Sequence, residues 1–267
     1  CEDPTQAVNY GLPAREQKWV YEPVPPRLQN IINQVDTQAE IWAELESNPT
    51  KYKDEIRYIQ DQWYYLFNGR WIYINGKLTY IDGWHYIYLN HWKFAGAISP
   101  DYRDRDRKIY HGIRYCYTTK EVPVRDENGI LVWEDKNAKK LKMSESKHKV
   151  CMGYTDPKGR RAGDSNKHLC AQYFETITRF GKNSGIVSSS GDHAKKKLFD
   201  EILVASWQQL PFFFKPVTSS DENPASSIDF KAGRKRAGAA RLQEQLKSKI
   251  DFSTTALSTQ YDGGKQF

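Results

Sequence analysis

Residues 149–209 alternate between strand-like and helix-like segments, and this alternation constrains the fold more than any other feature of the sequence. Runs of the kind found in strands lie at 149–155 and 184–190, whereas 165–180 and 193–209 have the character of helices. A strand–helix–strand–helix order is typical of parallel strands that are connected by helices. We therefore expect an α/β fold with a parallel sheet in this half of the chain.

The segment between the first of these strands and the first helix has the composition of a phosphate-binding loop. It reads PKGRRAGDS from residue 157 to residue 165. Such a loop needs backbone N–H groups at a helix N-terminus, a glycine that permits close approach, a mobile cation and a hydroxyl for Mg²⁺. Gly159 and Gly163 supply the permissive backbone, and Ser165 supplies the hydroxyl immediately before the helix.

The same loop departs from the usual phosphate-loop pattern at one position. Asp164 follows Gly163 where a lysine is usual, and an aspartate there repels phosphate unless it points away or is paired. Lys158, Arg160 and Arg161 lie on the loop, and their long side chains can reach the same phosphates. An ordinary strand–turn–helix that happens to be basic is the alternative interpretation.

A resemblance to a known family rests on this loop. The segment PKGRRAGDSNK resembles the deviant Walker A loop of large terminase subunits of tailed bacteriophages. The match is the order K-x-x-R-x-G-x-S, which Lys158, Arg161, Gly163 and Ser165 supply. Residues 73–94 and 100–115 resemble the segment before the ATPase loop in terminases of phages of gut Bacteroidetes hosts, and 184–216 resembles their second strand and helix. The likeness covers most of residues 58–267.

This resemblance implies a P-loop NTPase fold of the additional-strand, catalytic-glutamate type, with ATP and Mg²⁺ as cofactors. It implies that Lys158 and Arg161 neutralise developing charge on the β- and γ-phosphates, and that Ser165 ligates Mg²⁺. Backbone N–H groups around Gly163 hold the same oxygens, and Arg160 is either a helper or a trans-acting contact. The predicted nucleotide-binding residues are Gly159, Arg160, Gly163, Asp164, Ser165, Tyr102 and Arg103, of which the last two are candidates for the adenine pocket.

The partners implied by the resemblance are double-stranded DNA, a portal and a small terminase subunit, in an oligomeric ring within the host cell cytoplasm. A net charge of +7, from 40 lysines and arginines against 33 acids, favours polyanionic partners. A solvated linker is the alternative interpretation of the candidate DNA contacts, which are Arg234, Lys235, Arg236 and Arg241. No stretch approaches the roughly 20 apolar residues that span a bilayer, so we expect no membrane insertion.

Two parts of the chain are expected, and the second is expected to be incomplete. Residues 1–145 would form an N-terminal accessory region, and 146–267 a partial P-loop ATPase domain. The family's Walker B strand and nuclease carboxylates have no counterpart before Phe267, because polar residues precede Asp262. We therefore expect an N-terminal fragment of a longer protein that binds nucleotide weakly and does not hydrolyse it.

The accessory region is expected to be α+β with small antiparallel hairpins. Helical spacing runs through residues 16–68, and Asn75–Gly76 predicts a hairpin with a second turn at Asp82–Gly83, hence three short strands. Asn128–Gly129 predicts another hairpin. Residues 101–108 alternate acid and base before an amphipathic run, which is typical of a solvated helix face.

Two other functions remain open from the residues themselves. One is another P-loop motor, such as a helicase or a chromosomal ATPase. The other is a non-enzymatic module in which Trp63 to Trp92 form an aromatic face for nucleic acid or sugar, although a packed core also explains these aromatics. His193 is expected near a helix N-terminus rather than as a ligand. The four cysteines form no CxxC pair and no secretory signal is present, so reduced structural thiols in a protein that is not secreted are expected.

Overall fold

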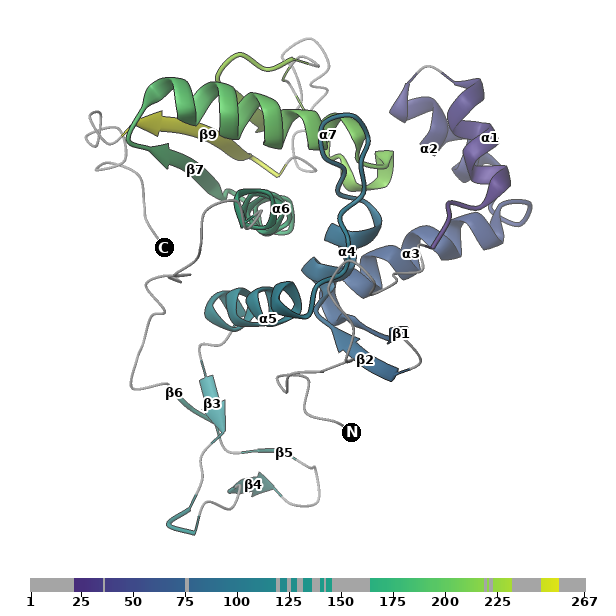
Figure 1. Cartoon of the computed structure of the whole chain (residues 1–267). Coiled ribbons are helices and arrows are strands. Elements are labelled where there is room, and N and C mark those ends of the chain that lie inside the picture. Colours follow the sequence, from purple (N-terminus) through teal and green to yellow (C-terminus); the bar gives the residue numbers. More distant parts are fainter. Residues whose placement is uncertain are drawn as a thin grey trace.

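Helices from the N-terminal half of the chain pack against helices from the C-terminal half, and the latter cover a small mixed sheet (Figure 1). The computed structural model describes residues 22–35, 37–74, 77–118, 121–123, 126–128, 132–135, 140–141, 143–145, 164–218, 220, 223–231 and 246–254.

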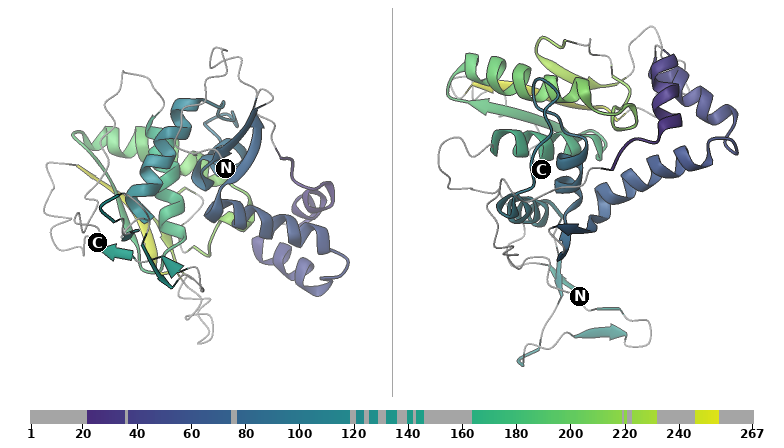
Figure 2. Two further views of the ribbon diagram at one scale, coloured as in Figure 1. Left: turned by 90° about the horizontal axis from the view of Figure 1, so that it is seen from below. Right: turned by 45° about the vertical axis from the view of Figure 1, so that its right-hand side comes forward.

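The first three helices form an arm that extends to one side of the sheet (Figure 2). They are α1 (Pro26–Gln34), α2 (Gln38–Ser47) and α3 (Lys53–Asn68). Pro26 begins α1 at a position that favours proline, and Thr37 forms a capping box with Glu40 at the start of α2. α3 ends at Gly69, whose φ of 70° suits glycine. The helical prediction is confirmed for its described part.

Strands β1 (Arg70–Ile74) and β2 (Lys77–Ile81) form the hairpin that Asn75–Gly76 predicts. The prediction of a third strand is wrong, because helix α4 (Gly83–Asn90) follows β2 instead. The Asp82 carboxylate caps this helix by accepting the Trp84 N–H at 2.9 Å. A Cβ at Gly83 would lie 2.0 Å from the Leu66 carbonyl oxygen, so only glycine allows α4 to approach α3 this closely. Every residue of α4 is buried, so its backbone N–H and C=O groups need hydrogen-bond partners within the protein. A helix supplies these partners from its own backbone, whereas a strand would need a neighbouring strand.

Helix α5 (Asp104–Thr118) is followed by four short strands whose pairing differs from the prediction. They are β3 (Glu121–Pro123), β4 (Trp133–Asp135), β5 (Lys140–Leu141) and β6 (Met143–Glu145). β3 pairs with β6 and β4 with β5, so the described strands do not pair as the predicted hairpin at Asn128–Gly129 requires; Gly129 itself lies outside the described residues. The Asp126 side chain instead accepts the Asn128 N–H at 2.9 Å, which makes a local side-chain turn.

The C-terminal half contains a three-stranded sheet of order β7-β9-β8. Its elements are α6 (Asp164–Ile177), β7 (Asn183–Ser188), the π-helical segment η2 (His193–Val204), α7 (Ala205–Gln209), the 3₁₀ turn η3 (Phe212–Phe214), β8 (Ser227–Phe230) and β9 (Ser248–Thr254). β7 runs parallel to β9, and β8 runs antiparallel to β9. The helix–strand–helix order predicted for 165–209 is confirmed, but the sheet is mixed rather than all parallel. The predicted strand at 149–155 lies outside the described residues.

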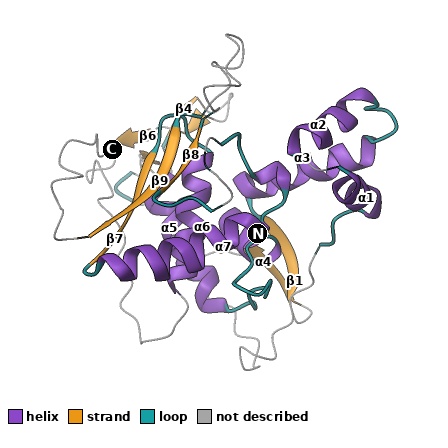
Figure 3. Ribbon diagram, turned by 90° about the horizontal axis from the view of Figure 1, so that it is seen from above, coloured by secondary structure: helices purple, strands orange, loops and turns teal. Residues whose placement is uncertain are grey.

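Helices α6 and η2 contact each other and cover one face of this sheet, whose strands β7, β8 and β9 are drawn in orange in Figure 3. Tyr173 of α6 contacts Phe230 of β8 with ring centroids 5.9 Å apart, and Phe199 of η2 contacts Phe252 of β9 at 5.1 Å. Among the described residues, the opposite face carries the half-exposed Val187 and an ion pair between Lys249 and Asp251. The described architecture is therefore mixed α/β with small sheets.

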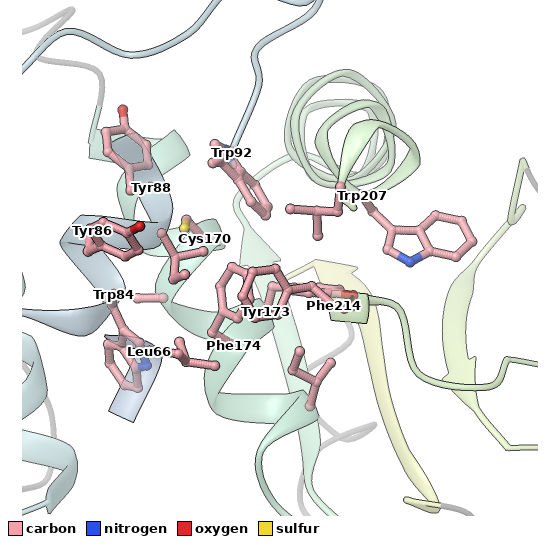
Figure 4. Close-up of a cluster of buried hydrophobic side chains, with 14 of the residues drawn as sticks. Leu66, Trp84, Tyr86, Tyr88, Trp92, Cys170, Tyr173, Phe174, Trp207 and Phe214 are labelled. Atoms are coloured by element: carbon pink, nitrogen blue, oxygen red, sulfur yellow. Dashed lines mark hydrogen bonds between the residues drawn. The ribbon is translucent and has the colours of Figure 1, made fainter. Parts of the chain in front are cut away.

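One hydrophobic core runs through both predicted parts of the chain, from Leu28 to Ile250. Figure 4 shows a portion of it, with side chains that include Trp84, Tyr86, Tyr88, Trp92, Cys170, Tyr173, Phe174, Trp207 and Phe214. The η3 turn joins the arm to this core, because Trp42 packs on Phe212 at 5.1 Å and the Trp63 indole donates to the Phe213 carbonyl at 3.2 Å. Cys170 is a buried free thiol whose pKa is raised by burial, as expected of a structural cysteine.

Candidate nucleotide-binding site

The predicted phosphate loop reaches the described part of the chain only at its last two residues. Asp164 and Ser165 begin α6. Lys158, Gly159, Arg160, Arg161 and Gly163 lie outside the described residues, so their roles remain predictions.

Asp164, the residue that fits a phosphate loop worst, points into the protein. Its side chain is 1% exposed and forms an ion pair with Lys167, one turn further along α6. Arg105 of α5 lies 3.4 Å from the other carboxylate oxygen. The charge of Asp164 is therefore paired and turned away from the surface at which α6 begins.

Lys167 joins this pair to a second buried acid. Its Nζ lies 2.7 Å from Asp106 Oδ1, and the Lys167 side chain is itself 1% exposed. Burial raises the pKa of Asp106, while the hydrogen bond and the charge of Lys167 oppose that rise. Asp106, Asp164 and Lys167 are buried, and the exposed Arg105 balances their charge from the edge; we call these four residues the buried ion cluster. It connects the start of α6 to α5.

The prediction of a solvated, alternating-charge face is wrong for part of α5. Asp106 and Arg107 are both buried, and the Arg107 guanidinium donates to Asp104 at 2.9 Å. The reason is that α5 packs against α4 and α6, so one side of the helix is enclosed although its sequence alternates in charge. Arg105 and Lys108 keep the exposure that was expected.

Ser165, in contrast to Asp164, is exposed and lines a groove of about 580 Å³ between α6 and η2. His193, Lys197 and Glu201 line it from η2, and Phe94 lines it from the segment after α4. This volume falls within the roughly 300–1,000 Å³ of small-molecule sites.

The segment that carries Phe94 is held to the neighbouring helices. The Trp92 indole donates to Asn166 of α6 at 3.5 Å, and the Ser206 hydroxyl of α7 donates to the Lys93 carbonyl at 2.6 Å. The Phe94 N–H donates to the Ile98 carbonyl at 2.8 Å across a tight turn. This wall of the groove is therefore fixed in place.

The groove lies at the carboxyl end of β7. The hydroxyls of Thr176, near the end of α6, and Ser184, near the start of β7, are 2.6 Å apart. The end of α6 therefore lies beside the start of β7, and the start of α6 lies toward the carboxyl end of the strand. There the hydroxyl of Ser188, the last residue of β7, lies 3.0 Å from His193 Nδ1 at the start of η2. Ligands of α/β proteins bind at the carboxyl ends of parallel strands, and helix N-termini favour anions.

Lys197 is the described cation that lines the groove. It pairs with Glu201 at 2.6 Å, with the two side chains 61% and 53% exposed. An exposed pair of this kind contributes about 0–1 kcal/mol, so an incoming anion can compete with the carboxylate for the lysine. The prediction that His193 lies at a helix N-terminus is confirmed, and its ring also borders the groove.

Sequence reasoning missed Phe94 and Lys197 as residues of this groove. Lys197 stands in a run of three lysines that carries no motif, and Phe94 follows an aromatic stretch in which it looks like its neighbours. Only the packing of the 92–98 segment against α6 and η2 brings them beside Ser165.

The predicted adenine contacts do not lie in this groove. Tyr102 is fully buried, and its ring stacks on His85 with centroids 5.6 Å apart. A base could reach this ring only after that part of the core opened. Arg103 is exposed but is not among the residues that line the groove.

The aromatic stretch from Trp63 to Trp92 divides into two groups. Trp84, Tyr86, Tyr88 and Trp92 are core residues, as the packed-core interpretation expects. The β1–β2 hairpin, however, leaves Trp71 and Tyr73 exposed. The candidate DNA contacts at 234–241 lie outside the described residues.

A second hollow of about 360 Å³ lies at the amino end of β7. It is bordered by Glu175 and Lys182, and the buried Glu175 carboxylate forms an ion pair with Arg179 at 2.9 Å. Burial raises the pKa of Glu175, while the two cations lower it. This hollow is at the opposite end of the strand from Ser165, so it is separate from the groove.

The described part of the chain lacks the features of two other kinds of site. It contains no group of three or more His, Cys, Asp or Glu residues placed to hold a metal ion. None of its helices combines the length and the apolar character needed to cross a membrane. In comparisons with known proteins, no family model, curated protein or solved structure matches this chain.

Proposed function

We propose that the start of α6 and the adjoining groove bind Mg²⁺–ATP, in an ATPase of the large-terminase type that drives double-stranded DNA into a prohead. The observation that carries this proposal is the opposite placement of two neighbouring residues. Asp164 is buried and ion-paired, whereas Ser165 is exposed in the first turn of the helix and lines the groove. An acid next to a phosphate site is tolerated when its charge is paired and turned away.

Each residue has a chemical role in this proposal. The N-terminus of α6 and the backbone around Gly163 donate N–H groups to the phosphate oxygens, and Lys158 and Arg161 neutralise their charge. Ser165 contributes a hydroxyl to the Mg²⁺ that the phosphates hold. Lys197 lies across the groove as a further cation, and the Phe94 ring offers an apolar surface to the base.

The assignment to DNA packaging, rather than to another P-loop motor, rests on the resemblance of the loop and its flanking segments to terminases. Double-stranded DNA, a portal, a small terminase subunit, a ring-shaped oligomer and the host cytoplasm belong to the same proposal. DNA binding should then weaken steeply with salt and depend little on sequence. For this chain we propose nucleotide binding; hydrolysis would also need a Walker B acid and a catalytic glutamate, roles that we assign to none of its residues.

The test is a titration of the 267-residue chain with a fluorescent ATP analogue, with and without Mg²⁺. We expect Lys158→Ala and Ser165→Ala to weaken binding about 10-fold or more, equivalent to about 1.4 kcal/mol. Ser165→Ala should also remove most of the Mg²⁺ dependence. Lys197→Ala should weaken binding less, because it adds charge from the far wall of the groove.

Lys196→Ala is the matched control for Lys197→Ala. Lys196 is the preceding residue, is exposed, pairs with Asp192 at 3.3 Å and does not line the groove. Its loss should leave the affinity unchanged. Unchanged affinity in both the Lys158 and the Ser165 variants would overturn the proposal.

A further inference from the structure

The β1–β2 hairpin carries apolar side chains on both of its faces. Its register places Trp71 opposite Tyr80 and Tyr73 opposite Leu78, on the same side of the ribbon. The other side contributes Ile74 and other buried residues to the core. We call the outward set of Trp71, Tyr73, Leu78 and Tyr80 the hairpin face.

The hairpin face is open to solvent. Tyr73 is 70% exposed, Leu78 42% and Trp71 40%. A hairpin with one face on a core normally alternates apolar and polar residues, so this face departs from the expected pattern. An exposed cluster of large apolar side chains indicates an interaction site.

The face is also held in a defined geometry. The rings of Trp71 and Tyr80 contact each other with centroids 5.6 Å apart. The Tyr80 hydroxyl donates to the Asn68 carbonyl at 2.9 Å, which fixes the hairpin to the end of α3. Successive side chains on one side of a strand are roughly 7 Å apart, so the face presents two adjacent rows.

Size and composition favour a small partner with planar rings. Residues 69–81 contain no Asp or Glu, so no carboxylate of the hairpin opposes an anion. Arg70 and Lys77 belong to the other side of the ribbon, where Arg70 pairs with Glu22 and Lys77 is exposed. Aromatic side chains bury roughly 150–250 Å² each, so this partly exposed set offers about 300–400 Å². A stable protein dimer needs about 800 Å² from each partner, which this face does not supply.

We propose that the hairpin face binds single-stranded nucleic acid by stacking unpaired bases on Trp71 and Tyr73. Sheet-face aromatics stack two or three bases in this way in known RNA-binding modules, and such stacking tolerates any sequence. Tyr73 is the most exposed ring of the face, and Tyr80 packs beside Trp71 with its hydroxyl bonded to the Asn68 carbonyl. This site is independent of the proposed nucleotide groove, and it acts on unpaired strands rather than on duplex DNA.

The test measures the anisotropy of a labelled oligothymidylate of about 15 nucleotides, a length typical of single-strand binding sites. Combined Trp71→Ala and Tyr73→Ser substitution should weaken binding about 10-fold or more. Tyr73→Ser alone should act in the same direction, and it should fold because this side chain is mostly exposed. Trp71→Phe should retain most of the affinity while losing the tryptophan quenching that binding produces.

Phe180→Ser is the matched control, because Phe180 is 69% exposed and lies elsewhere, after α6. The stacking contribution should persist at high salt, whereas binding by the basic residues 234–241 alone should disappear. Equal affinity in the hairpin variants and the control would overturn the proposal. Sedimentation that shows these variants to lose self-association, with oligonucleotide binding intact, would overturn it in favour of an interface between copies.

Discussion

The start of α6 and the hairpin face both depart from the usual rule that charged side chains are exposed and apolar side chains are buried, but they do so in opposite ways. At the start of α6, Asp164 and Lys167 are charged and buried, whereas on the hairpin Tyr73 and Leu78 are apolar and exposed. Buried charges are rare unless paired, and exposed apolar clusters are rare unless they bind something. The first region should therefore contribute mostly to stability and positioning, and the second mostly to binding.

The largest effect should come from breaking the buried ion cluster. Lys167→Met leaves Asp106 and Asp164 without their shared partner in the protein interior. Removing one member of a buried pair costs about 3–5 kcal/mol, so the free energy of unfolding in urea should fall by that amount. The exposed Lys196→Met, which also loses an ion pair, should change it by no more than about 0.5 kcal/mol. Equal effects for the two variants would show that the cluster is not a structural element.

Acid should destabilise the buried region through His85. This ring lies between Tyr102 and Tyr110, with centroids 5.6 and 5.2 Å away, and burial, with the charges of Arg107 and Lys167, lowers its pKa from 6.5 to about 3. The unfolded chain therefore takes up a proton below about pH 6.5, while the folded chain does not until about pH 3. The free energy of unfolding therefore carries no penalty from His85 well above pH 6.5, and it falls as the pH decreases from about 6.5 to about 3.

The size of this effect follows from the same pKa values. At pH 5, 1.5 units below the unfolded value of 6.5, His85 should cost about 2 kcal/mol relative to pH 7. His85→Phe should remove that part of the pH dependence, as measured by urea unfolding at both pH values. His91, whose pKa is likewise lowered to about 3 by burial and by Lys93, remains in both proteins. If the free energy of unfolding changed between pH 7 and pH 5 by the same amount in the variant as in the original protein, the burial of His85 would be contradicted.

Local patterns predicted the elements that local interactions determine. The arm helices, the β1–β2 hairpin, α6 and η2 followed from periodicity and turn residues, because caps and spacing act within a few residues. Asp82–Gly83 was misassigned because the same dipeptide serves a turn or a helix N-cap. Only the close approach of Gly83 to Leu66 distinguishes the two.

The parts that sequence could not reveal depend on contacts between distant residues. Lys167 and Asp106 are 61 positions apart, and nothing in an alternating-charge run distinguishes a buried acid from a solvated one. The pairing of β3 with β6 and the placement of Phe94 beside Ser165 also depend on tertiary packing. For the candidate site, sequence singled out Ser165, whose role stays a prediction, but gave no sign of the groove that it borders.

The smallest effect on stability should come from the hairpin face. Tyr73→Ser removes a mostly exposed ring, so the free energy of unfolding should change by no more than about 0.5 kcal/mol. The measurement is urea unfolding of this variant beside Lys167→Met. A loss of several kcal/mol would mean that the ring serves packing, and the contrast between the two regions would fail.

The most direct test of the nucleotide site is amide hydrogen exchange of the chain with and without a Mg²⁺-bound ATP analogue. Protection should increase in the first turn of α6, at Ser165 and Asn166, and at the start of η2, while the hairpin face stays unchanged. Addition of an oligothymidylate should give the converse pattern. Saturating analogue that leaves exchange at the start of α6 unaltered would contradict the proposed site.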